Sequence, residues 1–99
     1  MQLRNEFEPI RDWAKERGIY EKETVRGQFE KLLEEVNELN QAIIEKDKRE
    51  LIDAVGDCVV VLTNLSELAG VKIEECINSA YKVIKNRKGK MENGTFIKE

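Results

Sequence analysis

Two long stretches with helical hydrophobic periodicity follow one another across a short charged break, and they restrict the centre of the chain to a helical hairpin. Apolar side chains recur every three or four positions over residues 25–46, with no proline, and again over residues 48–69. This period is typical of amphipathic helices. Asp47 followed three residues later by Glu50 matches a capping box, so the second helix should begin just after Asp47. The sequence therefore predicts two antiparallel helices joined by a tight turn.

The segment before this hairpin predicts one shorter helix. Pro9 suits the first turn of a helix, where its missing N–H is not needed, and Gly18 is a helix stop. Residues 18–23 then form a connector, and Thr24 is placed to cap the long helix that follows.

After the hairpin, residues 72–86 predict a fourth amphipathic helix with its apolar side chains on one face. Residues 88–99 form a basic tail or a small hairpin, since Asn93-Gly94 between short apolar positions favours a two-residue turn. The whole chain, residues 1–99, is expected to be one all-α domain, a four-helix bundle.

Size and composition limit what such a domain can do. A domain of 99 residues with 40% apolar residues is only marginally stable alone, so we expect it to complete its core by oligomerisation. Its net charge of −3 gives no general reason to bind nucleic acid or an anionic membrane. The longest apolar run, residues 58–62, is too short to span a bilayer. The two cysteines and the lack of signal peptide features predict reduced thiols in a cytoplasmic protein.

The chain contains no histidine, which removes zinc sites and histidine-activated nucleophiles and leaves carboxylates to do any chemistry. Acidic side chains gather on both helices of the predicted hairpin. They are Glu34, Glu35 and Glu38 before the break, and Glu50, Asp53 and Asp57 after it. The last of them runs directly into an apolar segment, where an unpaired charge costs several kcal/mol, by a rough estimate. A bound divalent cation would compensate for that cost.

The hairpin geometry ranks these acids. With a turn centred near residue 47, facing residue numbers sum to about 95, which puts Glu38 level with Asp57. Glu35 shares a helix face with Glu38. Asp53 would lie about 6 Å along the axis and Glu50 about 10 Å away. We therefore expect Glu35, Glu38 and Asp57 as first metal ligands, Asp53 next, and Glu50 as a helix cap.

Oxygen ligands without nitrogen or sulfur suit a hard cation such as Mg²⁺ or Mn²⁺. Magnesium commonly completes its coordination with water and substrate phosphates. The sequence therefore favours metal-assisted hydrolysis of a phosphorylated substrate.

The order of these elements resembles the MazG-like branch of the all-α nucleoside triphosphate pyrophosphohydrolases, in particular its short, often phage-encoded members. The resemblance rests on the EExxE element at residues 34–38, on DAVGD at residues 53–57, and on the flanking stretches IRDWAKERGIY and AYKVIKNRKGKMENGTFIKE. It covers nearly the whole chain from about Ile10.

The resemblance implies Mg²⁺-dependent hydrolysis of a nucleoside triphosphate between the α and β phosphates, giving the monophosphate and pyrophosphate. By position, Glu35, Glu38 and Asp57 match metal-binding acids of the family. The chain departs from the family at Ala54, where a glutamate is usual. Either Asp53, one residue earlier, or Glu50 could take its place.

The resemblance also implies a homodimer or homotetramer whose sites are completed by neighbouring helices. Trp13, Asn64 and Asn86 become candidates for contacts to the base or sugar. The candidates for phosphate contacts are Lys82, Lys85, Arg87 and Lys88, and those for a secondary metal or catalytic role are Glu34 and Glu50.

Two other functions fit parts of the sequence. The first is a non-catalytic helical interaction or regulatory module whose acids meet a basic partner. The second is DNA binding by the basic run at residues 82–90, which the acidic balance of the whole chain disfavours.

Overall fold

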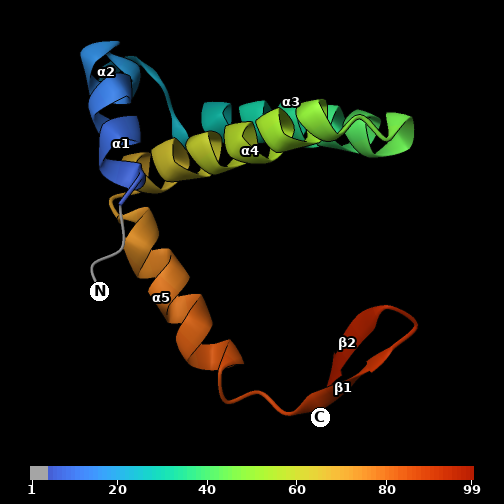
Figure 1. The fold of residues 1–99 in the computed structure, drawn as a ribbon. Coiled ribbons are helices and arrows are strands. Elements are labelled where there is room, and N and C mark those ends of the chain that lie inside the picture. The colour runs from blue at the N-terminus through green and yellow to red at the C-terminus, as the bar shows by residue number, and fades with distance from the viewer. Residues whose placement is uncertain (1–4) are drawn as a thin grey trace.

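The computed structural model of the chain describes residues 5–99. The fold is all-α apart from one small sheet, as predicted, and its helices are arranged in an L shape (Figure 1). The elements are α1 (Phe7–Glu16), α2 (Ile19–Lys22), α3 (Val25–Glu45), α4 (Lys48–Leu68), α5 (Ile73–Ile84), β1 (Gly89–Glu92) and β2 (Thr95–Lys98).

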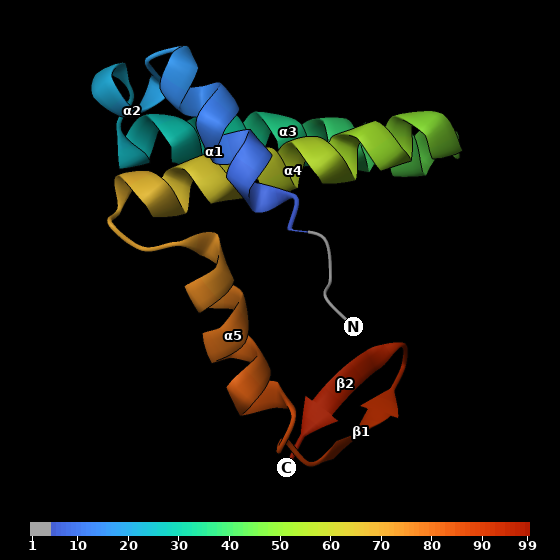
Figure 2. The same cartoon turned by 60° about the vertical axis from the view of Figure 1, so that its left-hand side comes forward.

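Helices α3 and α4 form the predicted antiparallel hairpin and lie side by side over their whole lengths (Figures 1 and 2). Thr24 caps α3, because its hydroxyl accepts a hydrogen bond from the Gly27 N–H at 2.9 Å. Asp47 caps α4 in the same way, with the Glu50 N–H at 3.1 Å. Between the helices the chain reverses over two residues, Lys46 in a left-handed conformation with φ 55° and Asp47 in an extended one.

The connector at residues 18–23 differs from its prediction, because it contains the short helix α2, so the fold has five helices among the described residues rather than four. Gly18 is responsible. Its φ of 74° turns the chain after α1, and its carbonyl accepts the N–H groups of Glu21 and Lys22. Helices α1 and α2 pack across the end of the α3–α4 hairpin that lies away from Lys46 (Figure 2).

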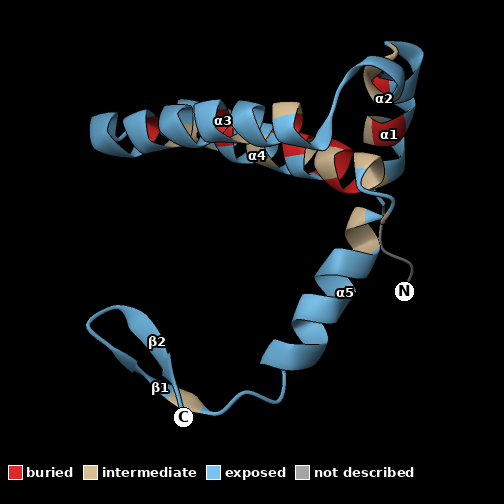
Figure 3. Cartoon of the chain, turned by 180° about the vertical axis from the view of Figure 1, so that it is seen from behind, coloured by how far each residue is buried: buried red, intermediate tan, exposed pale blue. Residues whose placement is uncertain are grey.

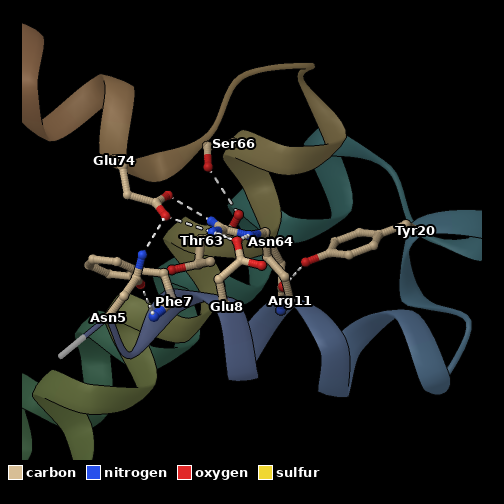
Figure 4. A network of polar contacts seen from close by, with 9 residues as sticks. All are labelled: Asn5, Phe7, Glu8, Arg11, Tyr20, Thr63, Asn64, Ser66 and Glu74. Atoms are coloured by element: carbon tan, nitrogen blue, oxygen red, sulfur yellow. Dashed lines mark hydrogen bonds and ion pairs between the residues drawn. The ribbon is translucent and has the colours of Figure 1, made fainter.

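An ion pair between α1 and α5 fixes the direction in which α5 leaves α4 (Figure 4). Arg11 is buried, and its Nη1 and Nη2 bind the two carboxylate oxygens of Glu74 at 2.7 and 2.6 Å. Arg11 also binds Glu8, and Asn5 donates to Glu74. This network raises the pKa of Arg11 and lowers that of Glu74 to about 2. The first turn of α5 is thus anchored on α1.

Beyond that anchor α5 and the β1–β2 hairpin form an arm, residues 73–98, that extends away from α3 and α4 (Figure 1). Every residue from 75 to 88 is exposed (Figure 3). The tail forms the small hairpin that the sequence allowed, with Glu92 paired to Thr95. Asn93 and Gly94 both have positive φ, 49° and 78°, as a tight two-residue turn requires.

The buried apolar core of the single chain is small and lies near α1 and between α3 and α4 (Figure 3). Within residues 5–99, its buried apolar side chains are Ala14, Ala42, Ala54 and Val61. The apolar residues of α4 predict a helix that is buried on most sides. In one chain this is wrong, since Val55 is 46% exposed and Leu62 39%. No helix or strand within residues 5–99 covers that face. The Cα radius of gyration, 15.9 Å, also exceeds the ~13 Å of a compact domain this long.

Over the described part of the chain, no single helix is long and apolar enough to cross a membrane. Helices α4 and α5 pass that test only when taken together, and the chain bends by 103° between them.

Candidate functional site

Three carboxylates meet where the middle of α3 faces the middle of α4. Glu35, Glu38 and Asp57 each offer an oxygen, and these three atoms lie within 4.8 Å of one another. Glu35 and Glu38 share a face of α3 because they are one helical turn apart. Asp57 comes level with them because the turn at Lys46 is so short. These are the three acids that the hairpin geometry ranked first, and we call them the acid cluster.

Charge and burial make the acid cluster an unfavourable arrangement by itself. Glu35 is only 7% exposed, and its Oε2 is a buried oxygen without a hydrogen-bond partner within residues 5–99. Its other oxygen, Oε1, lies 3.5 Å from the Lys31 ammonium. Loss of hydration, with the negative charges of Glu35 and Asp53, raises the pKa of Asp57. One lysine thus faces several carboxylates.

The remaining predicted acids lie beside the cluster rather than in it. A cavity of about 280 Å³ opens on the side of the cluster nearer the Lys46 turn. It is lined by Glu38, Gln41, Ala42, Glu45, Glu50, Asp53, Ala54 and Asp57. Asp53 and Glu50 therefore face the same space as the cluster, and Glu50 also donates its backbone N–H to the Asp47 cap. Ala54, where the family glutamate is usual, is buried in the wall of this cavity.

A second cavity, of about 390 Å³, opens on the other side of the cluster. It is lined by Trp13, Ile19, Glu23, Gln28, Lys31, Glu35, Asp57, Val60, Val61 and Asn64. Asp57 belongs to both cavities, so the cluster stands at their junction. We call this second space the aromatic cavity, after Trp13. The Arg17 guanidinium lies 4.5 Å from the centre of the Trp13 ring and covers one of its faces.

The residues predicted to contact phosphate are not brought to the cluster. Lys82, Lys85, Arg87 and Lys88 all lie in the exposed arm, away from α3 and α4 of their own chain, as does Asn86, which was predicted to contact the base or sugar (Figures 1 and 2). Glu34 is also outside the cluster, since it is exposed and pairs with Lys31 at 3.4 Å.

Sequence reasoning missed three residues that the fold brings to this region. Lys31 follows the spacing of a helical ion pair with Glu35, which is a recognisable signal. Gln28 is buried in the aromatic cavity and donates to Glu23 at 2.9 Å. Tyr20 donates its hydroxyl to Asn64 at 2.6 Å. The last two had no sequence signal, because they depend on how α2 packs against α3 and α4.

The donor set fits a hard divalent cation. Carboxylate oxygens are the ligands that Mg²⁺ and Mn²⁺ prefer. The unpartnered Glu35 Oε2 is a buried acceptor that a cation would satisfy. A cation would also offset the loss of hydration and the neighbouring negative charges that raise the pKa of Asp57.

A family model described as phosphoribosyl-ATP pyrophosphohydrolase matches residues 8–92. The chain belongs to this family. The phosphoribosyl-ATP pyrophosphohydrolase family is part of the MazG-like nucleotide pyrophosphohydrolase superfamily, so the resemblance read from EExxE and DAVGD is confirmed at the level of the superfamily. The match spans all of the acid cluster and both cavities. It identifies a family of hydrolases that act on the acid anhydride bonds of nucleotides.

A curated relative is an uncharacterized 18.2 kDa protein in the rep-hol intergenic region of Haemophilus phage HP1, 36% identical over 58 residues. That alignment covers 59% of this chain and 36% of the phage protein, so it spans about a third of the relative's length. No solved structure matched the chain.

Proposed function

We propose that the protein is a Mg²⁺-dependent nucleotide pyrophosphohydrolase that cleaves a nucleoside triphosphate between the α and β phosphates, with Mn²⁺ as an alternative cation. The observation that carries the proposal is the acid cluster, with its buried and unpartnered Glu35 Oε2, at the junction of two cavities. Membership of a pyrophosphohydrolase family supports the same reaction class.

In this proposal Glu35, Glu38 and Asp57 hold the cation. When bound, the cation neutralises phosphate charge and orients or acidifies a water molecule. Lys31 balances part of the negative charge of the cluster, since its ammonium is 3.5 Å from Glu35. The aromatic cavity takes the nucleoside, with the uncovered face of Trp13 available for the base.

The cavity on the other side of the cluster supplies the groups that move the proton. Water attacks one phosphorus, and the bond between that phosphorus and the bridging oxygen breaks. Attack at the α phosphorus sends the bridging oxygen away with pyrophosphate. Attack at the β phosphorus leaves the bridging oxygen on the monophosphate and adds the water oxygen to pyrophosphate. The proton of the attacking water needs an acceptor near the phosphates. The acids of that cavity outside the cluster are Glu45, Glu50 and Asp53. Glu45 already accepts a hydrogen bond from Gln41, so we assign this role to Asp53 or Glu50.

The proposal includes a second copy of the chain. The arm carries the predicted phosphate-binding lysines, but it extends away from its own cluster, so these residues would act on the cluster of a partner. Apolar side chains on one face of α5 are exposed, among them Ile77 at 49% and Tyr81 at 57%. Burying them against the uncovered faces of α3 and α4 would supply the core that the single chain lacks.

A pyrophosphate-release screen over ribo- and deoxynucleoside triphosphates with Mg²⁺ tests the proposal. We expect release from at least one substrate, and loss of at least a hundredfold in kcat/KM in Glu38→Gln. Glu34→Gln is the matched control, since it removes an exposed glutamate of the same helix outside the cluster. The proposal is wrong if no nucleotide releases pyrophosphate and Glu38→Gln binds Mg²⁺ as well as wild type does.

The alternative function, a non-catalytic interaction module, makes a different prediction. A ligand that binds only the folded state raises Tm by linkage. Mg²⁺ with a nucleotide should therefore raise the Tm of a hydrolase by several degrees and leave that of an interaction module unchanged.

A further inference from the structure

The aromatic cavity contains an amide whose orientation is fixed from outside the cavity. We propose that Tyr20 is a positioning residue that turns the amino group of Asn64 into the aromatic cavity and thereby selects nucleobases that present a carbonyl oxygen there. The inference rests on the proposed function, because it assigns the base subsite of that same site.

The contact that carries the inference joins two elements far apart in the chain. Tyr20 lies in α2 and Asn64 in α4, and the Tyr20 hydroxyl donates to Asn64 Oδ1 at 2.6 Å (Figure 4). This is a short, well-formed O–H···O hydrogen bond. Tyr20 does not line the aromatic cavity, whereas Asn64 does. The phenol therefore holds the amide oxygen without itself lining the ligand space.

The other end of the amide is available to a ligand. Among the described residues, no group accepts a hydrogen bond from Asn64 Nδ2. Asn64 is only 3% exposed. Within residues 5–99, however, the buried side-chain polar atom that is sealed from solvent and lacks a hydrogen-bond partner is Glu35 Oε2, and not Asn64 Nδ2. Asn64 Nδ2 therefore keeps its access to solvent. Asn64 lines the aromatic cavity, and Nδ2 is the polar atom of its side chain that no described residue holds.

The hydrogen bond also resists reversal of the amide. Burial raises the pKa of the Tyr20 hydroxyl, so the group remains a protonated donor at neutral pH. A flipped amide would point its own donor at the phenol, whose hydrogen would then need another acceptor. The flip costs about one hydrogen bond. The Asn64 amide therefore presents its N–H donors to the cavity and keeps its oxygen on Tyr20.

A fixed donor discriminates between bases that differ in one group at the same ring position. Uracil and thymine carry a carbonyl where cytosine carries an amino group, and guanine and hypoxanthine differ in the same way from adenine. A carbonyl accepts from Asn64 Nδ2, whereas an amino group meets it donor to donor and leaves both desolvated groups unpaired. The cavity should therefore prefer the carbonyl-bearing base of each pair.

The test is calorimetric binding of the non-hydrolysable α,β-imido analogues of dUTP and dCTP in the presence of Mg²⁺. For wild type we expect the dUTP analogue to bind about tenfold more tightly, the effect of one buried hydrogen bond. In Tyr20→Phe the amide can rotate, so the ratio of the two Kd values should fall to about twofold or less. Ser79→Ala, which removes an exposed hydroxyl on α5 away from its apolar face, is the control and should keep the wild-type ratio.

Hydrolysis provides a second readout. Tyr20→Phe should raise KM for dUTP while leaving kcat for the two substrates nearly unchanged, which a general loss of structure would not do. Equal binding of the two analogues by wild type, a preference for the dCTP analogue, binding of neither, or an unchanged ratio in Tyr20→Phe overturns the inference. Discrimination without pyrophosphate release would instead contradict the proposed function alone, and release without discrimination would contradict the inference alone.

Discussion

The acid cluster should make the protein less stable until a cation binds, and Asp57→Asn measures this directly. The substitution keeps the shape of the side chain and removes one negative charge. It should raise the free energy of unfolding of the metal-free protein and abolish the stabilisation by Mg²⁺. If the only role of Asp57 were structural, the substitution would instead lower the free energy of unfolding of the metal-free protein.

The structure gives the size of the effect. Two unit charges 4.8 Å apart repel by about 0.9 kcal/mol at the dielectric constant of water. Asp57 faces both Glu35 and Glu38, so neutralising it removes two such repulsions. Salt screens these two repulsions, since Glu38 and Asp57 are exposed. The nearby Lys31 ammonium reduces the total repulsion further. We expect a gain of about 1 kcal/mol, which is roughly 4–8 °C in Tm for a domain of this length.

The assay is thermal unfolding at one protein concentration, first in EDTA and then across a Mg²⁺ titration. Wild type should gain Tm as Mg²⁺ is added, because the cation binds only the folded state. The Tm of Asp57→Asn should be higher than that of wild type in EDTA and should not change as Mg²⁺ is added. Glu34→Gln is the control for net charge: it removes a negative charge that is exposed and paired with Lys31, so its Tm in EDTA should stay the same or fall.

Two results would refute this reasoning. If Asp57→Asn is no more stable than wild type in EDTA, the cluster is not strained by repulsion. If Glu34→Gln gains as much as Asp57→Asn, the effect belongs to the net charge of the chain and not to the cluster.

Three further predictions concern the rest of the fold. The low pKa of Glu74, about 2, means that its pairing with Arg11 stabilises the protein above the ordinary glutamate pKa and that this contribution is lost as pH falls toward 2. Glu74→Gln should thus cost about 1–2 kcal/mol at pH 7, allowing for the partial exposure of Glu74, and almost nothing near pH 2, by urea unfolding. Ile77→Asp should weaken self-association in sedimentation experiments, while Asn78→Asp, next to it but off the apolar face, should not; equal behaviour of the two would exclude α5 from the interface. Thr24→Ala should cost about 1 kcal/mol of stability by loss of the α3 cap, and an unchanged Tm would show that the cap contributes nothing.

The central hairpin could be predicted because each of its features is local. The helical spacing of the apolar side chains predicted the two helices, and the short polar side chains of Thr24 and Asp47 indicated where each helix starts. Once the turn was placed near residue 47, simple helix geometry was enough to bring Glu35, Glu38 and Asp57 together. Their role as metal ligands stays a prediction, as does the choice between Asp53 and Glu50.

The features that sequence did not reveal depend on contacts between distant segments. In the sequence, Arg11 and Glu74 look like ordinary surface charges. Arg11 is buried only because α1 packs on α4 and Glu74 at the start of α5 binds its guanidinium. The contact from Tyr20 to Asn64 depends on α2, which the sequence showed only as a connector. The exposure of the apolar face of α4 could not be predicted either, because periodicity shows that a face is apolar and not which chain covers it.

The single left-handed residue at Lys46 has a consequence for how such a chain can change over evolution. Because the turn has no slack, one residue inserted between it and Asp57 would move that carboxylate by about 1.5 Å and rotate it by about 100°. The insertion would take Asp57 out of the cluster while leaving two intact helices. Gaps should therefore be absent from residues 38–57 in working relatives, a pattern that an alignment of active homologues can display without any structure.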